Sequence, residues 1–216
     1  LTAYIYWDLL VRCLRLNGLK VRRVLHLTDV GHLVSDGDEG EDKLEKGAAR
    51  EGRDVWEVAE EYIAKFRESC QALELTEPEV WARATDYISE DIAAVDAMTA
   101  RGFTYETSDG IYFDTSKLDE YYIFNKYDAE DLEVGVREGV FEDTNKRNKT
   151  DFVLWFTKSK FEDQELKWES PWGLGYPGWH IECSCISMKH LGEDLDIHAG
   201  GIDNAFHHHT NEIAQS

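Results

Sequence analysis

Residues able to bind a metal ion gather near the end of the printed sequence. Cys183, His208 and Glu212 offer a thiol, an imidazole and a carboxylate, which are the side chains that bind Zn²⁺ in proteins. His208 and Glu212 are four residues apart, so on a helix their side chains lie on one face, one turn apart. Three protein ligands with one open position are typical of a zinc ion that takes part in chemistry.

Each of these residues also has an ordinary structural explanation. A histidine and a glutamate four residues apart are often an exposed polar pair, and a lone Cys183 is often a small buried apolar residue. The run from His207 to His209 could bind metal adventitiously in a loop. The His-Glu-x-x-His arrangement of hydrolytic zinc enzymes is missing. Residue types and spacing alone therefore leave the metal site as one of several interpretations.

A glycine-containing turn and two polar residues suggest a nucleotide or small-ligand site. Gly200 and Gly201 would let the backbone approach a ligand closely. Asp203 follows them and is either a ligand-binding acid or a turn residue. Thr28 follows a predicted strand, at the end where open α/β sheets bind ligands, although a helix cap explains a threonine there as well.

Three segments around these residues resemble one known family. They are residues 179–184 (WHIECS), 196–203 (DIHAGGID) and 208–216 (HHTNEIAQS). In order and spacing they resemble the cysteinyl-tRNA synthetases, which are class I aminoacyl-tRNA synthetases. Shorter matches are spread along the chain, at residues 27–30 (LTDV), 151–155 (DFVLW) and 170–173 (SPWG). The resemblance therefore covers nearly the whole sequence.

The resemblance implies a cytoplasmic ligase that activates cysteine with ATP and transfers the cysteinyl group to tRNA(Cys). It implies one Zn²⁺ per chain, which would select the substrate thiolate over the alcohol of serine because zinc prefers soft ligands. The metal ligands that it implies are Cys183, His208 and Glu212.

The resemblance also implies roles for residues around the metal. Substrate cysteine would be bound by Thr28, Trp179 and His198. His198 would also be catalytic, by assisting removal of the thiol proton. ATP would be bound by Gly200, Gly201 and Asp203, with Asp203 accepting hydrogen bonds from the ribose. A buried core position is the structural alternative for Trp179.

The sequence departs from the family pattern in places. His207 stands where proline is usual, so the register of the ligands could shift by one residue. Cys185 stands where alanine is usual and offers a competing thiol. The family's HIGH and KMSKS motifs are expected before Leu1 and after Ser216, so the chain is expected to be a fragment that is inactive alone. Two alternatives stay open: the related ligase that joins cysteine to an amino sugar, and a non-catalytic zinc-binding paralogue.

Composition limits the possible partners. The 216 residues carry a net charge of −21, which argues against a general basic surface for nucleic acid. A tRNA would then be held by a few local cations or by regions outside this sequence. Four cysteines show no disulfide framework, and no apolar stretch is long enough to cross a membrane.

Hydrophobic periodicity predicts the elements that would position these residues. Helices are expected at residues 2–17, 56–73 and 88–101, with Cys13 and Cys70 on buried stripes. Strands are expected at 21–27, 103–113 (a hairpin with an Asp-Gly turn) and 151–156, and the acidic segment 33–54 is expected to be a loop entering a solvated helix.

The expected fold class is α/β. The resemblance implies a Rossmann-like class I catalytic domain interrupted by a small β-rich connective insertion. Its first part would be residues 1–102, the insertion 103–172 and its second part, with the zinc site, 173–216.

Overall fold

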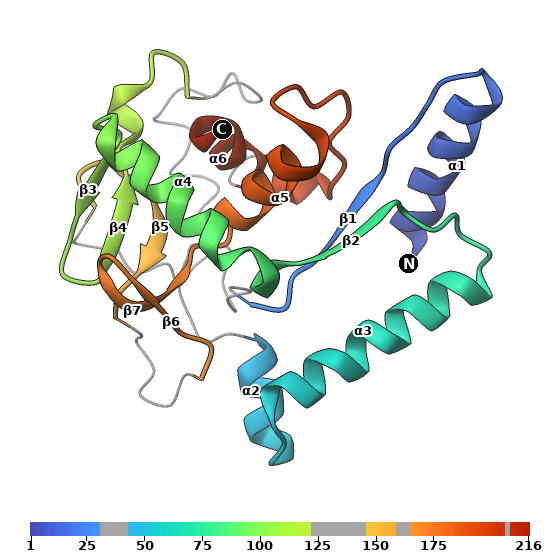
Figure 1. The fold of residues 1–216 in the computed structure, drawn as a ribbon, viewed down its shortest axis with the longest axis horizontal. Coiled ribbons are helices and arrows are strands. Elements are labelled where there is room, and N and C mark those ends of the chain that lie inside the picture. The colour runs from blue at the N-terminus through green and yellow to red at the C-terminus, as the bar shows by residue number, and fades with distance from the viewer. Residues whose placement is uncertain (31–42, 122–145, 159–164, 206–207) are drawn as a thin grey trace.

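The computed structural model describes residues 1–30, 43–121, 146–158, 165–205 and 208–216 (Figure 1). Residues 33–42 of the acidic segment, which was expected to be a loop entering a helix, lie outside this part of the chain, as does His207; the rest of the segment is described and contains the helix Lys43–Glu51. The α-helices are α1 (Thr2–Leu16), α2 (Lys43–Glu51), α3 (Val55–Ala72), α4 (Ile88–Ala100), α5 (Ile181–Leu191) and α6 (His208–Gln215). The strands are β1 (Val24–Leu27), β2 (Val80–Arg83), β3 (Thr104–Glu106), β4 (Gly110–Phe113), β5 (Phe152–Phe156), β6 (Trp168–Ser170) and β7 (Gly173–Pro177).

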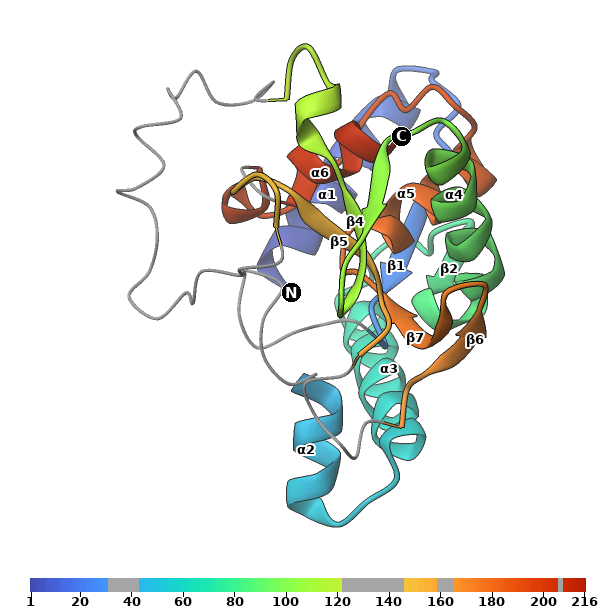
Figure 2. The same ribbon diagram turned by 90° about the vertical axis from the view of Figure 1, so that its left-hand side faces the viewer.

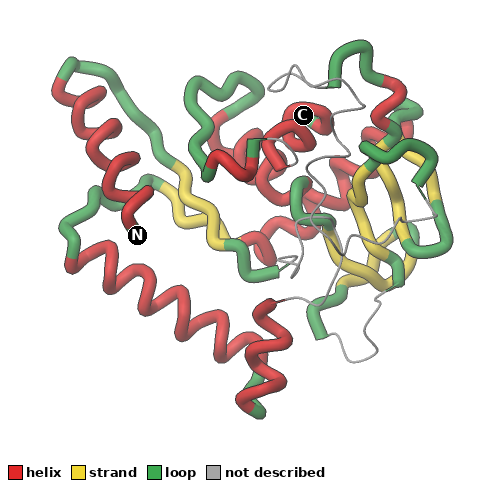
Figure 3. Tube along the Cα trace, turned by 180° about the vertical axis from the view of Figure 1, so that it is seen from behind, coloured by secondary structure: helices red, strands yellow, loops and turns green. Residues whose placement is uncertain are grey.

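These strands form two sheets of different kinds. β1 and β2 pair in parallel, whereas β3, β4, β5, β7 and β6 form a five-stranded antiparallel sheet in that order. Helices α4, α5 and α6 lie beside the larger sheet, and the β1–β2 pair extends away from it toward α1 and α3 (Figures 1 and 2). The fold is therefore mixed α/β, with helices beside both sheets (Figure 3), and α2 and α3 share an apolar cluster with Leu166 and with Trp168 of β6.

The main core lies between the larger sheet and the helices that carry the site. All five residues of β5 are buried, and Leu154 and Trp155 are completely so. They share one apolar cluster with Val95 of α4 and Ile181 of α5. Since burial of each large apolar side chain contributes about 1.5–3 kcal/mol, this cluster fixes the start of α5 against the sheet.

Local signals explain where the predicted helices begin and end. The Asp54 side chain accepts hydrogen bonds from the backbone N–H groups of Trp56 and Glu57, so it caps the N-terminus of α3. Gly102 follows α4 with φ of 82°, a conformation that ends helices and that glycine adopts without strain. The three predicted helices are confirmed within one or two residues.

One feature predicted for α1 is wrong. Cys13 was expected in the core but is exposed, and Leu9 and Leu16 on the same helix are 51% and 88% exposed. Helix α1 does have an apolar face, but the described residues leave much of that face exposed. Cys70 on α3, in contrast, is buried as expected.

The larger sheet contains one predicted hairpin and one that was missed. β3 and β4 pair as expected, but the turn residues are Ser108 and Asp109, because the N–H of Thr107 bonds the carbonyl of Gly110. Gly110 itself belongs to β4. The β6–β7 hairpin was not predicted, and β7 leads into α5. A side chain at Gly178, just after β7, would collide with the backbone of β5.

Candidate metal centre

Two short helices bring the candidate ligands together. Cys183 lies in the first turn of α5, and α6 supplies His208 and Glu212. The helices pack against each other through polar contacts: Ser184 Oγ donates to the Glu212 carbonyl at 3.3 Å, and Gln215 Nε2 donates to Ser184 Oγ at 3.0 Å. The two helices therefore hold a fixed relation at the site.

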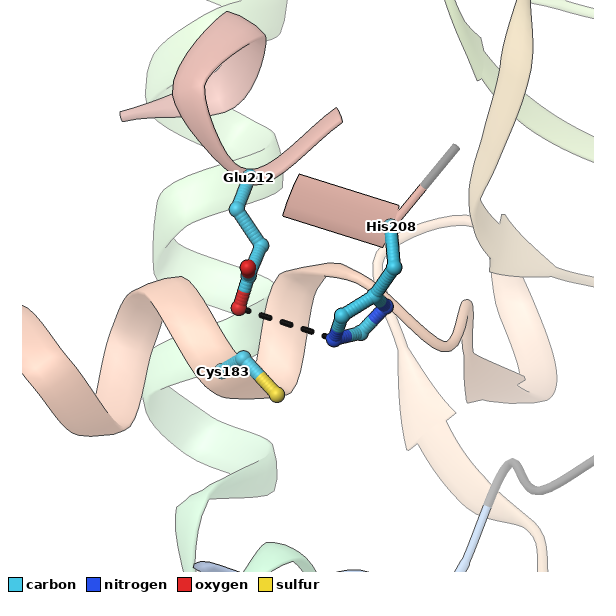
Figure 4. Close-up of side chains that lie close together, drawn as sticks. All are labelled: Cys183, His208 and Glu212. Atoms are coloured by element: carbon cyan, nitrogen blue, oxygen red, sulfur yellow. Dashed lines mark ion pairs between the residues drawn. The ribbon is translucent and has the colours of Figure 1, made fainter. Parts of the chain in front are cut away.

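The structure brings the three candidate ligands together. One ligand atom from each of Cys183, His208 and Glu212 lies within 4.8 Å of the others, and all three residues are buried. Figure 4 shows their side chains pointing toward one another, with His208 Nε2 at 3.6 Å from Glu212 Oε1. His208 is the first residue of α6, so the one-turn relation between His208 and Glu212 is confirmed.

The protonation states of two of these groups suit a cation. Burial, together with the nearby His180, lowers the pKa of His208 to about 3, so its imidazole is neutral at pH 7. Burial opposes ionisation of Glu212, but hydrogen bonds from His198 and His209 outweigh it and hold the pKa of Glu212 below its usual range. A neutral imidazole and an ionised carboxylate are the forms that bind metal.

The thiol of Cys183, unlike these two groups, is not in its metal-binding form when no cation is present. Burial, together with the negative charge of Glu212, raises the pKa of Cys183 well above its usual value. A cation placed among the three side chains would favour the thiolate and so release this proton. The donor set of thiolate, imidazole and carboxylate is one that Zn²⁺ takes, and the residues therefore fit a zinc ion.

His198 lies at the outer edge of this cluster. Its side chain is 34% exposed, and its Nε2 is 2.8 Å from Glu212 Oε2. The hydrogen bond with Glu212 raises the pKa of His198. His198, His209 and Glu212 form a second group whose ligand-capable atoms lie within 4.8 Å of one another.

A cleft adjoins the cluster on the side of β1. It has a volume of about 300 Å³, and its lining includes His26, Leu27, Thr28 and Asp29 from the end of β1 together with residues of α3. Thr28 is exposed there, as a residue at the end of a strand was expected to be. His26, which lines the cleft, also touches Cys183, with Nδ1 3.2 Å from Sγ, so one histidine contacts both the cleft and a candidate ligand.

Four further residues were predicted to belong to the site: Trp179, Gly200, Gly201 and Asp203. Trp179 is half-buried, and its ring centroid is 4.3 Å from that of His208. Gly200 packs under the ring of His209, while Gly201 is exposed before a short 3₁₀ helix, Ile202–Asn204. Asp203 belongs to that helix, and its side chain lies outside the described residues.

Sequence reasoning gave no role to His26 or His180 at this site, and it treated His209 only as part of a histidine run. His26, His180 and His209 each lie within hydrogen-bonding distance of one candidate ligand. His180 and His209 are close to the ligands in sequence, but their types do not reveal which way they point. His26 is 157 residues from Cys183, and nothing in its surroundings signals the contact.

Comparison with known proteins identifies the family. Residues 2–216 match the family described as "tRNA synthetases class I (C) catalytic domain". The chain belongs to this family. A cysteine–tRNA ligase of Treponema denticola is 50% identical over 216 residues, which are 100% of this chain and 44% of that protein. Cysteine–tRNA ligase 1 of Burkholderia lata is 48% identical over 216 residues, which are 100% of this chain and 45% of that protein.

A third relative has similar coverage. The cysteine–tRNA ligase of Zymomonas mobilis is 45% identical over 216 residues, again 100% of this chain, and the match covers 41% of its own length. The chain thus spans less than half the length of these synthetases. Among its described helices, none is long and apolar enough to cross a membrane. Cys183, His208 and Glu212 form a buried candidate metal site in a homologue of the cysteinyl-tRNA synthetases.

Proposed function

We propose that the protein carrying this chain is a cysteine–tRNA ligase. It would join cysteine to the AMP part of ATP, forming cysteinyl-adenylate with release of pyrophosphate, and then transfer the cysteinyl group to tRNA(Cys) with release of AMP. The observation that carries the proposal is the buried cluster of Cys183, His208 and Glu212 beside an open cleft, in a chain of the cysteinyl-tRNA synthetase family. The cleft volume of about 300 Å³ is within the range of small-molecule sites.

Within this proposal, the chain supplies the catalytic domain. Residues 1–102 and 173–216 would be the two parts of a Rossmann-like nucleotide-binding domain, and 103–172 would be its β-rich insertion. The parallel pair β1–β2 supports the first part, because Thr28 at the end of β1 lines the cleft where such folds bind ligands.

Cys183, His208 and Glu212 would hold a zinc ion. Zinc bound there would supply a preference for the soft thiolate of cysteine over the hydroxyl of serine. The protein would contribute by keeping the His208 imidazole neutral and the Glu212 carboxylate ionised, which are the forms that bind a metal.

The remaining residues would bind and orient the substrates. Trp179, packed on His208, would form a wall beside the cysteine side chain, and Thr28 would contact cysteine from the cleft. His198, exposed at the rim and bonded to Glu212, would accept the thiol proton. Gly200, Gly201 and Asp203 would bind ATP.

Selectivity between cysteine and serine gives the sharpest test of the metal's part. A preference of about 10⁴-fold corresponds to roughly 5.5 kcal/mol. A small group gained or lost in an apolar pocket supplies only about 1–3 kcal/mol. Shape alone is therefore insufficient, and most of the preference must come from the metal site.

The experiment uses the ligase at its natural length. Pyrophosphate exchange with cysteine and with serine is measured before and after zinc removal, and in Cys183→Ser with the exposed Cys13→Ser as the matched control. Cysteine activation should fall by orders of magnitude on zinc removal and in Cys183→Ser, while serine activation stays at its low level. An unchanged cysteine-to-serine ratio in demonstrably metal-free enzyme would place thiol recognition elsewhere, with His198 the first residue to examine.

The acceptor is tested separately. Charging of tRNA(Cys) should be observed, with no product from an amino sugar. Product formed with the amino sugar and not with tRNA(Cys) would move the assignment to the related sugar ligase, and failure to activate cysteine at all would favour a non-catalytic paralogue.

A further inference from the structure

Each of the three candidate metal ligands has a different histidine as its neighbour. We propose that His26, His180 and His209, the supporting histidines, position the ligating atoms of Cys183, His208 and Glu212 through one hydrogen bond each. The proposal rests on the metal site described above. It assigns roles to three residues that would hold no metal themselves, in the way that outer hydrogen bonds orient the ligands of other metal centres.

His26 would position the sulfur of Cys183. Its Nδ1 lies 3.2 Å from Cys183 Sγ, within the range of a hydrogen bond to sulfur. With the proton of its imidazole on Nδ1, His26 would donate a hydrogen bond to the sulfur. Among the described residues, His26 belongs to none of the three-residue groups whose ligand atoms lie within 4.8 Å of one another. It therefore contacts the thiol from outside the cluster.

His180 would select the tautomer of His208. The two Nδ1 atoms are 2.9 Å apart and both rings are buried. A neutral imidazole carries one proton, and His208 Nε2 is the atom that faces Glu212. For Nε2 to offer its lone pair to a metal, the proton of His208 must be on Nδ1 and donated to His180. His180 thus keeps the ligating nitrogen free.

His209 would fix the carboxylate of Glu212. Its Nδ1 is 2.7 Å from Glu212 Oε2, the oxygen that His198 also contacts at 2.8 Å. Both distances are typical of charge-assisted hydrogen bonds. With Oε2 held by two histidines, Oε1 is left facing His208 and the open centre of the cluster. Gly200 supports the arrangement, because the ring of His209 occupies the space where a Cβ would lie.

Two substitutions at each position distinguish the loss of a hydrogen bond from a change in side-chain volume. Asparagine at position 26, 180 or 209 keeps a polar atom near the place of the lost Nδ1, whereas leucine keeps similar volume with no polar atom. The six single variants are made in the full-length ligase, with His190→Leu as the matched control. His190 is on α5 but bonds Tyr87 away from the cluster.

The readout is metal binding and not activity. Zinc and cobalt affinities are measured by competition with a chromophoric chelator, and the cobalt–thiolate absorption reports the geometry at Cys183. Each leucine variant should bind metal about 10–100-fold more weakly than the unmodified protein. Each asparagine variant should bind distinctly better than its leucine counterpart, and His190→Leu should leave affinity unchanged. Where leucine prevents folding, alanine at the same position takes its place.

The outcomes distinguish this proposal from the one on which it rests. Leucine variants with unchanged affinity and an unchanged cobalt spectrum would overturn the role of the supporting histidines. Equal losses for asparagine and leucine at position 26, with the spectrum of a lost nitrogen ligand, would make His26 a ligand and overturn its outer role. An unmodified protein that holds no metal would instead refute the metal site, and metal binding without cysteine activation would refute only the proposed function.

Discussion

Asp91 on α4 is a carboxylate in an unusually apolar place. It is completely buried, and among the described residues no N–H or O–H group donates to its side-chain oxygens, which leaves the Cys185 thiol as its polar neighbour. Burial raises its pKa to about 7, and the neighbouring Cys185 thiol opposes that shift. Since a free aspartate titrates near 3.8, folding favours the protonated form of Asp91.

The burial of Asp91 predicts that the free energy of unfolding depends on pH. The stabilising effect of protonated Asp91 is fully present below about pH 4 and is lost as pH rises through about 7. At about 1.4 kcal/mol per pKa unit, the loss is on the order of 4 kcal/mol. Asp91→Asn should remove this dependence, and the exposed Asp96→Asn on the same helix should not. Urea unfolding of the three proteins between pH 5 and 8 measures the difference; parallel pH profiles for Asp91→Asn and the unmodified protein would contradict it.

His207 and His208 should differ sharply in importance. His208 faces Cys183 and Glu212, whereas His207 lies outside the described residues, and one position along a helix would turn a side chain about 100° away. His208→Ala should therefore abolish tight metal binding, and His207→Ala should leave the metal content near that of the unmodified protein. Metal analysis after mild chelation checks both. Retention by His208→Ala together with loss in His207→Ala would mean that the ligand register is shifted by one residue.

At the scale of elements, Gly200 connects the loop before α6 to the site. A Cβ at this position would collide with His209 Nε2 and lie 2.8 Å from His209 Cε1. Gly200→Ala should displace the His209 ring, loosen Glu212 and weaken metal binding, whereas Gly47→Ala on α2, where a Cβ meets open space, should not. If Gly200→Ala raises the KM for ATP with metal affinity unchanged, the glycine serves nucleotide approach instead.

The elements show what periodicity can and cannot predict. α3 and α4 were predictable because apolar residues recur along one side and a cap or glycine marks an end. β6 and β7 were missed because their residues alternate weakly and because β7 contains two glycines and one proline. Cys13 was misplaced because an apolar stripe on α1 shows that a face could be buried but not which residues cover it.

Part of the candidate site could likewise be predicted from the sequence, and part could not. Cys183, His208 and Glu212 could be proposed from residue type, spacing and family resemblance, and the structure brings them together. The supporting histidines could not be proposed. Their positions depend on how β1, the start of α5 and α6 pack in space, and the contact of His26 with Cys183 spans 157 residues. Local sequence patterns carry no information at that separation.

At the scale of the molecule, the metal site ties separate segments into one unit. α5 and α6 supply the ligands, and β1 touches Cys183 through His26. Zinc should therefore stabilise the whole fold, by about 2.7 kcal/mol when free zinc is 100 times its Kd. The gain should grow with pH because Cys183 must release its proton.

Denaturant unfolding with and without zinc measures this coupling. Cys183→Ser should lose most of the gain, and the exposed Cys13→Ser should keep it. A gain that is equal in the two variants would show that zinc acts elsewhere on the protein.

Cys183 and Cys185 stand two residues apart on α5, which has a consequence for oxidation. Residues at this spacing point to opposite sides of a helix, and Cys185 neighbours Asp91 on α4 while Cys183 faces α6. The two thiols therefore cannot close on each other as a disulfide without unwinding the helix. Oxidants that strip the metal should therefore oxidise Cys183 without pairing it with Cys185. A mild thiol reductant and fresh zinc should then restore the site without refolding.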